Sequence, residues 1–329
     1  MHKLLIALFL TLSIPLLIGS AENAYAAAVR TIIDNPGFAD NVLEDNPGDG
    51  TDDGFVSASI GFAVNFFGSF FNDLFVNNNG NTTFESGFND FNPQNIDFTT
   101  SNRKIIAPFF SDIDTRTGTT PPLAGKVTYG QSTVDGRPAF GVNWFNVFCF
   151  AGNSLDLLNT FQLVLIDRSD INPGDFDIEF NYDEVIWDTA LSAEPITPVI
   201  DEECIEEVSG GQSAKIGFAD GTGNPNTNTQ ANNFFELAGS GVSRAFLDSG
   251  PSGTSLIQNS LNSPVLGRYI IPVRDGNPFN DVIEMIGGKI IPIESSSLLL
   301  AGAQSVTWLI PISLSIIGIG LVLVKRRIH

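Results

Sequence analysis

The sequence predicts an all-β protein, an antiparallel β-sandwich ectodomain followed by a single C-terminal transmembrane helix. Short segments carry apolar residues at every second position, and turns rich in glycine and asparagine separate them. Convincing amphipathic helices are scarce before the C-terminal tail, and strand patterns do not alternate with helix patterns as they do in βαβ units. With 43% hydrophobic residues and 27 Phe, the chain can bury a substantial core. A single domain of about 220 residues lies within the usual range for all-β folds.

Three segments carry the clearest strand patterns. Apolar residues recur at every second position in residues 56–66, as a half-buried strand requires. Residues 160–166 are rich in Phe, Leu and Ile, and residues 176–183 alternate strictly between apolar and acidic or amide side chains. The linking residues 167–175 contain the turn signal Asn172-Pro173-Gly174. We therefore expect a hairpin with one face on the core and one acidic face in water.

A second hairpin is predicted around Asn79-Gly80, because this dipeptide best tolerates the two positive φ values of a type I′ turn. Residues 74–78 and 81–84 would be its strands. Asn81-Thr82-Thr83 is the only Asn-x-Ser/Thr sequon without proline, so Asn81 is a candidate glycosylation site. The alternative is that Asn81 simply closes the turn.

The N-terminus has the layout of a secretory signal peptide at residues 1–26. A basic start precedes an apolar run at residues 4–18, and Ala24-Tyr25-Ala26 fits the small-x-small cleavage pattern. A run of about 15 residues is short for a bilayer span, although an uncleaved anchor is the alternative. Residues 27–52 hold two Asp-Asn-Pro-Gly turn signals and are expected to form an extended leader.

A transmembrane helix is predicted at residues 306–324, which contain no charged residue. At 1.5 Å rise per residue this segment spans roughly 28 Å, close to the thickness of a hydrocarbon core. The basic tail at residues 325–329 is expected on the cytoplasmic side, which places everything before the span outside. Residues 275–305 would be a stalk. A buried core helix is the alternative for 306–324.

Charge and histidine content exclude several classes of function. Residues 27–305 hold 12 basic and 36 acidic residues, a formal charge of −24. Such a field repels nucleic acid, although simple solvation explains the charge equally well. The only histidines are His2 and His329. The exterior therefore lacks Ser-His-Asp and Cys-His nucleophilic sites and His-ligated zinc or iron.

The chain has two cysteines, Cys149 and Cys204. In an exported chain they most simply pair as one disulfide, and two free thiols are the alternative.

The order of these features resembles the extracellular NIDO (nidogen-like) domain, over residues 53–274. The matching motifs are Phe66-Phe67-Gly68 with 74–80 and Phe84, residues 106–116 with 125–129, residues 142–144 with 159–165, residues 175–183 with Trp187, and a closing segment with Ala219, Gly239-Ser240-Gly241 and Gly267-Arg268-Tyr269. The resemblance implies a cell-surface or matrix protein that acts in cell–matrix or cell–cell adhesion. The resemblance implies that animal relatives carry further modules, whereas here we expect the domain to stand alone on an anchor. Residues 291–304 and the span that follows resemble C-terminal modules of archaeal surface proteins.

Five carboxylates are candidate calcium ligands. Asp112 and Asp114 are two residues apart, so on a strand both would face one hard cation. Asp167, Asp170 and Asp175 could supply further oxygens from the predicted hairpin loop. Solvated carboxylates or a salt bridge from Asp112 or Asp114 to Arg116 are the alternatives.

The same acids permit a glycosidase hypothesis, because paired carboxylates hydrolyse glycosides without histidine. Chance pairs are expected in so acidic a chain, and Asp114-Thr115-Arg116 is not the Asp-Thr-Gly of aspartic proteases. We therefore expect no enzyme activity.

The expected extracellular partner is a matrix or surface protein or a glycan. The C-terminal helix is expected to contact the membrane, and no nucleic-acid partner is expected. A calcium-dependent glycan-binding module and a structural surface-coat component are the alternatives.

Overall fold

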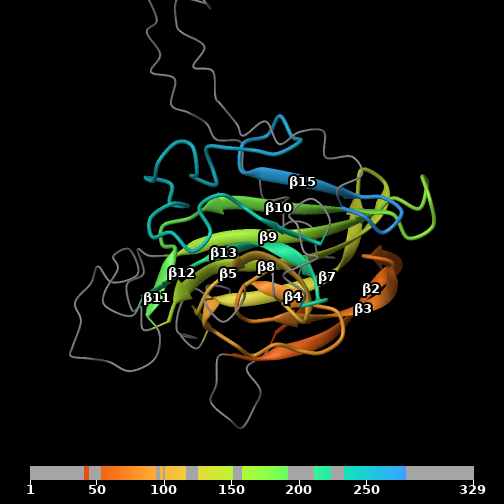
Figure 1. Cartoon of the computed structure of the whole chain (residues 1–329), viewed down its shortest axis with the longest axis horizontal. Helices are drawn as coiled ribbons and strands as arrows, with labels where there is room; N and C mark the ends of the chain where they lie inside the picture. The colour runs from red at the N-terminus through yellow and green to blue at the C-terminus, as the bar shows by residue number, and fades with distance from the viewer. Residues whose placement is uncertain are drawn as a thin grey trace, which may run out of the picture. The chain divides into compact units, whose positions relative to one another are not determined.

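In the computed structural model, the regular secondary structure of the described residues consists of β-strands (Figure 1). The ranges that it describes are 41–43, 53–93, 97–98, 101–115, 125–150, 158–191, 211–223 and 233–278. Within them no helix is long and apolar enough to cross a membrane. The predicted signal peptide, transmembrane residues 306–324 and cytoplasmic tail lie outside the described ranges.

The first sheet contains seven strands, all paired antiparallel. They are β1 (Asn41–Val42), β6 (Ile113–Asp114), β7 (Lys126–Val134), β8 (Arg137–Cys149), β9 (Asn159–Asp167), β10 (Phe176–Glu184) and β15 (Arg268–Val273). Their order is β1-β7-β8-β9-β10-β15, and β6 pairs with the end of β8. β1 lies within the predicted leader, so part of that segment belongs to the sheet.

The second sheet contains six strands, again antiparallel. They are β2 (Phe55–Phe66), β3 (Ser69–Asn77), β4 (Asn81–Thr83), β5 (Lys104–Phe110), β13 (Lys215–Asp220) and β14 (Phe234–Glu236). Their order is β14-β13-β5-β4-β3-β2. A separate two-stranded sheet joins β11 (Thr189–Leu191) to β12 (Gly211–Ser213).

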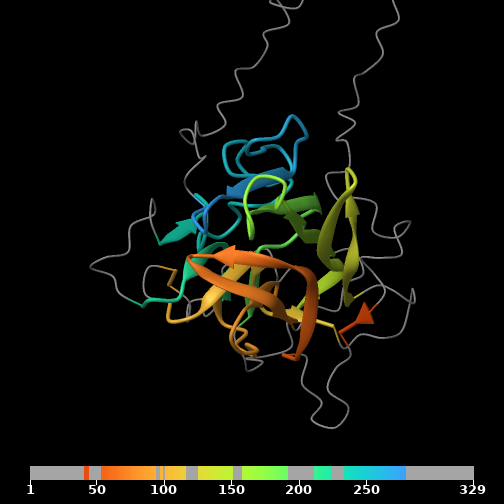
Figure 2. The same cartoon turned by 90° about the vertical axis from the view of Figure 1, so that its right-hand side faces the viewer.

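The two large sheets lie against each other as in an antiparallel sandwich (Figures 1 and 2). They enclose a common core rich in aromatic side chains. Phe109 on β5 meets Phe161 on β9 with their ring centroids 5.2 Å apart, and Phe66 on β2 meets Phe176 on β10 at 6.3 Å. Burying one such ring stabilises the fold by about 1.5–3 kcal/mol. The predicted sandwich is confirmed for the described part of the chain.

The predicted strands at 56–66, 160–166 and 176–183 are confirmed as β2, β9 and β10. β9 and β10 form the predicted hairpin, with Phe176 opposite Asp167. The prediction that the acidic face of β10 lies in water is wrong for Asp177, Glu179 and Asn181, whereas Asp183 near the end of the strand is exposed. Glu179 and Asn181 have no exposed surface, because basic and amide side chains from neighbouring strands pack against that face.

The hairpin at Asn79-Gly80 is confirmed as β3 and β4, but its turn is not the predicted two-residue type I′ turn. Asn77 pairs with Asn81, which leaves a three-residue loop, and of these three residues only Gly80 has a positive φ, of 70°. β5 passes so close that a Cβ on Gly80 would lie 1.7 Å from the carbonyl oxygen of Phe109. Glycine is therefore required by this contact and by the left-handed backbone.

Candidate functional site

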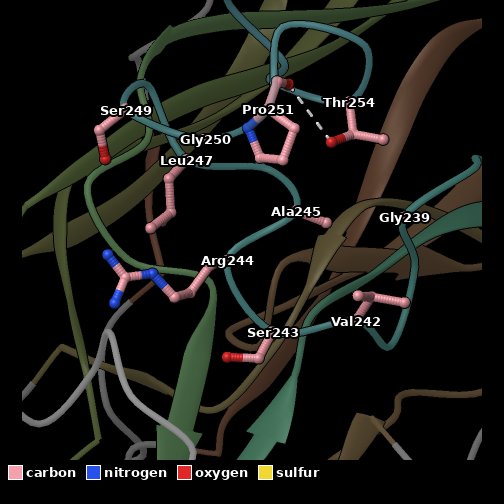
Figure 3. A pocket seen from close by; sticks show the side chains of 10 residues that line it. All are labelled: Gly239, Val242, Ser243, Arg244, Ala245, Leu247, Ser249, Gly250, Pro251 and Thr254. Carbon is pink, nitrogen blue, oxygen red and sulfur yellow. Dashed lines mark hydrogen bonds between the residues drawn. The ribbon is translucent and has the colours of Figure 1, made fainter.

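A surface hollow of about 740 Å³ lies on the loop between Gly239 and Thr254 (Figure 3). We call it the Arg244 hollow. The ten residues that line it are labelled in the figure. Several are apolar, and Ser243, Ser249 and Thr254 add hydroxyl groups.

A buried carboxylate holds the loop in place from below. Asp188, which follows β10 and has no exposed surface, accepts hydrogen bonds from the backbone N–H groups of Arg244 at 3.0 Å and Phe246 at 3.1 Å. Burial raises the pKa of Asp188, and these hydrogen bonds and the nearby Arg244 charge oppose the rise. The bonds hold Arg244 at a φ of 64°, a left-handed conformation that costs a non-glycine residue on the order of 1–3 kcal/mol.

A second carboxylate fastens the same loop further along the chain. Asp248 accepts a hydrogen bond from the backbone N–H of Val185 at 3.0 Å, and its own N–H donates to the Val185 carbonyl at 2.9 Å. Burial raises the pKa of Asp248 to about 7, with a further contribution from the negative charges of Glu184 and Asp183. The loop is thus joined to the end of β10 at two places.

The Arg244 side chain is exposed, and within the described part of the chain no acidic side chain forms an ion pair with it. Figure 3 shows Ser243, Arg244 and Ser249 extending toward the same side of the loop. A guanidinium group presents five N–H donors in a rigid fork, which suits carboxylate, sulfate or hydroxyl oxygens of a ligand. Val242, 58% exposed, adds an apolar contact surface.

The candidate calcium ligands do not meet in one place. Asp167 accepts from the N–H and hydroxyl groups of Ser169, which closes the turn after β9. Asp170 is exposed and accepts from Arg137 at 3.1 Å and from Arg168 at 3.2 Å. These two bonds lower the pKa of Asp170, with Arg137 as the larger cause.

Asp175 lies at the other end of the same loop, fully buried, and accepts from the backbone N–H of Asp275 at 2.8 Å. Asp112 and Asp114 are buried beside β8, on either side of the core residue Ile113. Among the residues with defined positions, no cluster of three or more Asp, Glu, His or Cys side chains is arranged to hold a metal. The five carboxylates therefore do not form one group, and calcium binding at Asp112 and Asp114 or in the hairpin loop stays a prediction. Arg116 lies outside the described ranges.

Asn81 is fully buried in β4. Its side-chain oxygen accepts from Asn77 at 2.8 Å, and its side-chain nitrogen, the atom that would carry a glycan, donates to the Asn79 carbonyl at 3.0 Å. This geometry favours the turn-closing role over glycosylation of the folded domain.

Cys149 is buried at the end of β8, while Cys204 lies outside the described ranges, so their pairing stays a prediction.

Sequence reasoning missed a row of polar side chains that crosses five strands of the first sheet. Each strand contributes one residue, and hydrogen bonds of 2.9–3.0 Å connect them in the order Thr128, Asn143, Gln162, Asn181 and Arg268. We call it the cross-strand row. Glu179 is joined to its end, 2.7 Å from Asn181 and 3.4 Å from Arg268. The signal available in the sequence was an amide within each of two predicted strands, Gln162 in 160–166 and Asn181 in 176–183.

Beside this row, Asp177 lies between two arginines. Its carboxylate oxygens are 2.8 Å from Arg168 Nη1 and 2.5 Å from Arg274 Nη2. Arg274 also donates to the backbone carbonyl of Phe176 at 2.8 Å. This arginine pair and the cross-strand row keep Asp177, Glu179 and Asn181 of β10 out of water.

The nidogen-like domain family matches residues 72–275, which is more than half of the chain. Alpha-tectorin of Mus musculus is 29% identical over 208 residues, 57% of this chain and 8% of the relative. Alpha-tectorin of Gallus gallus is 31% identical over 192 residues, 53% of this chain and 8% of the relative. The chain thus spans 8% of the length of these curated relatives.

No solved structure matches the chain. None of these similarities supports the resemblance of the C-terminal segment to archaeal surface-protein modules. The domain family and the likeness to alpha-tectorin fit an extracellular, matrix-type protein. With a match over more than half of its length, the chain belongs to the nidogen-like domain family.

Proposed function

We propose that this protein is a non-catalytic adhesion protein of the cell surface. The predicted helix at 306–324 anchors it, and the nidogen-like domain binds a matrix or surface protein or glycan outside the cell. Membership of the family and the likeness to alpha-tectorin support the extracellular, matrix-type part of this proposal. The apolar, uncharged stretch and the basic tail that follows support the anchor.

The observation that carries the proposed contact site is the exposed Arg244 in its hollow. The chain carries a net charge of −21, so an exposed guanidinium that forms no ion pair with any acidic side chain of the described ranges stands out from its surroundings. The buried Asp188 and the partly buried Asp248 fix the backbone of the loop beneath it, so little backbone freedom is lost when a partner binds. Arginine fixed in this way is typical of residues that contribute most to binding.

The test uses the full-length chain in liposomes, with the domain on the outside, and measures retention on arrays of matrix proteins and glycans. Arg244→Gln should weaken retention by about tenfold, the effect of losing one charge-assisted contact of about 1.4 kcal/mol. Arg103→Gln is the matched control, because it removes the same charge outside the Arg244 hollow. The Arg103 guanidinium lies over the Phe88 ring, 4.7 Å from its centroid, so this variant should retain binding.

Three outcomes would count against parts of the proposal. Equal retention of wild type and Arg244→Gln would exclude the hollow as the contact site. Absence of retention on every surface, together with self-assembly of the free chain, would replace adhesion by a structural coat role. Release of the chain from cells by carbonate washing, with 306–329 intact, would exclude the anchor.

A further inference from the structure

Three segments far apart in the sequence meet at one end of the sandwich. The N–H of Asn65, near the end of β2, donates to the Gly174 carbonyl in the β9–β10 turn at 2.8 Å. The N–H of Asp275, after β15, donates to Asp175 Oδ1 at 2.8 Å. A Cβ on Gly276 would lie only 2.6 Å from Asn65 Oδ1. We call this meeting point of Asn65, Gly174–Asp175 and Asp275–Gly276 the 65–175–275 junction.

Two buried oxygen atoms of the junction have no hydrogen-bond donor. One is Oδ2 of Asp175, a carboxylate with no exposed surface, and the other is Oδ1 of Asn65. No basic side chain in the described ranges forms an ion pair with Asp175. Buried polar atoms are nearly always satisfied in folded proteins, and a buried charge is rarely left without compensation. The junction therefore lacks a positively charged or donating group.

The other groups of the junction are also oxygens. Asp275 contributes a second carboxylate, which is exposed and accepts from the Asn172 side chain at 3.2 Å. The carbonyls of Gly174 and Gly276 lie on the same segments. Two carboxylates, an amide oxygen and backbone carbonyls, without nitrogen or sulfur ligands, form a donor set typical of calcium. Calcium accepts six to eight oxygens in irregular geometry, and water supplies those the protein does not.

We propose that the 65–175–275 junction is a calcium site in which Asp175 Oδ2 and Asn65 Oδ1 are protein ligands and Asp275 supplies the second negative charge. Of the five carboxylates singled out in the sequence, only Asp175 takes part. The ion joins β2 of the second sheet to the β9–β10 turn and the end of β15 in the first. A buried water in place of the ion would donate hydrogen bonds but would leave the charge of Asp175 uncompensated. The site is independent of the Arg244 hollow, so either proposal can fail alone.

The experiment compares the melting temperature of the full-length chain in detergent, in EDTA and in calcium chloride, by the fluorescence of the buried Trp144 and Trp187. Calcium at about 100 times its dissociation constant should raise the wild-type melting temperature by roughly 5–10 °C. Asp175→Asn keeps an acceptor for the Asp275 N–H but removes the charge. It should abolish the calcium shift and should melt no lower than wild type in EDTA.

Asp170→Asn is the matched control, because it changes an exposed carboxylate in the same loop and should leave the calcium shift intact. Asn65→Ala leaves the carboxylates in place and should weaken calcium binding at least tenfold in a calorimetric titration. If Asp175→Asn fails to fold, this second variant still tests the proposal. The proposal is overturned if calcium leaves the wild-type melting temperature unchanged. An equal calcium shift in wild type and Asp175→Asn would overturn it as well.

Discussion

Replacing Asp177 by asparagine tests whether the polar face of β10 is held out of water. The substitution preserves shape but leaves the guanidinium groups of Arg168 and Arg274 without their shared carboxylate. Breaking a buried ion pair costs about 3–5 kcal/mol. Because Arg168 keeps 23% of its side chain exposed, we take the lower end, about 3 kcal/mol. If the face were in water, as the alternation alone predicts, the loss would be at most about 1 kcal/mol.

Urea unfolding followed by tryptophan fluorescence measures this loss, and a domain of this size should melt roughly 6–12 °C lower. Asp170→Asn is a matched control, because Asp170 shares Arg168 but is exposed, so its substitution should destabilise the fold far less than Asp177→Asn does. Salt should reduce the effect of Asp170 and leave most of the effect of Asp177. A loss below about 1 kcal/mol for Asp177→Asn, or equal losses in both variants, would refute the reasoning.

Three further predictions concern the loop, the turn and the sequon. Because the pKa of Asp248 is raised to about 7, the folded state binds this proton more tightly than the unfolded chain does. The contribution of Asp248 to stability should therefore fall as the pH rises from about 4 to 7. Asp248→Asn should flatten that part of the plot of melting temperature against pH. Gly80→Ala should cost about 3 kcal/mol or more in urea unfolding, and Gly136→Ala, with a similar φ of 79° but no atom within 4 Å, only about 1 kcal/mol. Asn81→Gln should destabilise the fold by about 1–3 kcal/mol, and glycosidase treatment of the wild-type chain should leave its mass unchanged.

The strands could be predicted because alternation is a local property of the chain. Residues 160–183 show their hairpin without reference to anything distant, and the structure confirms it. Whether the polar face of that hairpin meets water depends on Arg274, which is 97 residues from Asp177. No local pattern could reveal that partner.

The same limit applies to the turn and to the candidate site. Asn79-Gly80 correctly predicts a hairpin, but the close passage of Phe109 decides the form of the loop. The loop of the Arg244 hollow is positioned by Asp188, 56 residues away from Arg244, and the sequence marks it only by the Gly239-Ser240-Gly241 motif. Charged residues at a site built from such long-range contacts become recognisable only once the chain is folded.

The cross-strand row has a consequence for how the first sheet assembles. Side chains alternate between the faces of a sheet, so a strand misaligned by one position would turn its amide toward the apolar core. The neighbouring amides of the row, such as Asn143 and Asn181 beside Gln162, would then lose hydrogen bonds in a place without water, at about 1–3 kcal/mol each. An apolar strand interior would accept several alignments with little difference in energy. By penalising every misaligned intermediate, the row makes one arrangement of five strands the stable product of folding.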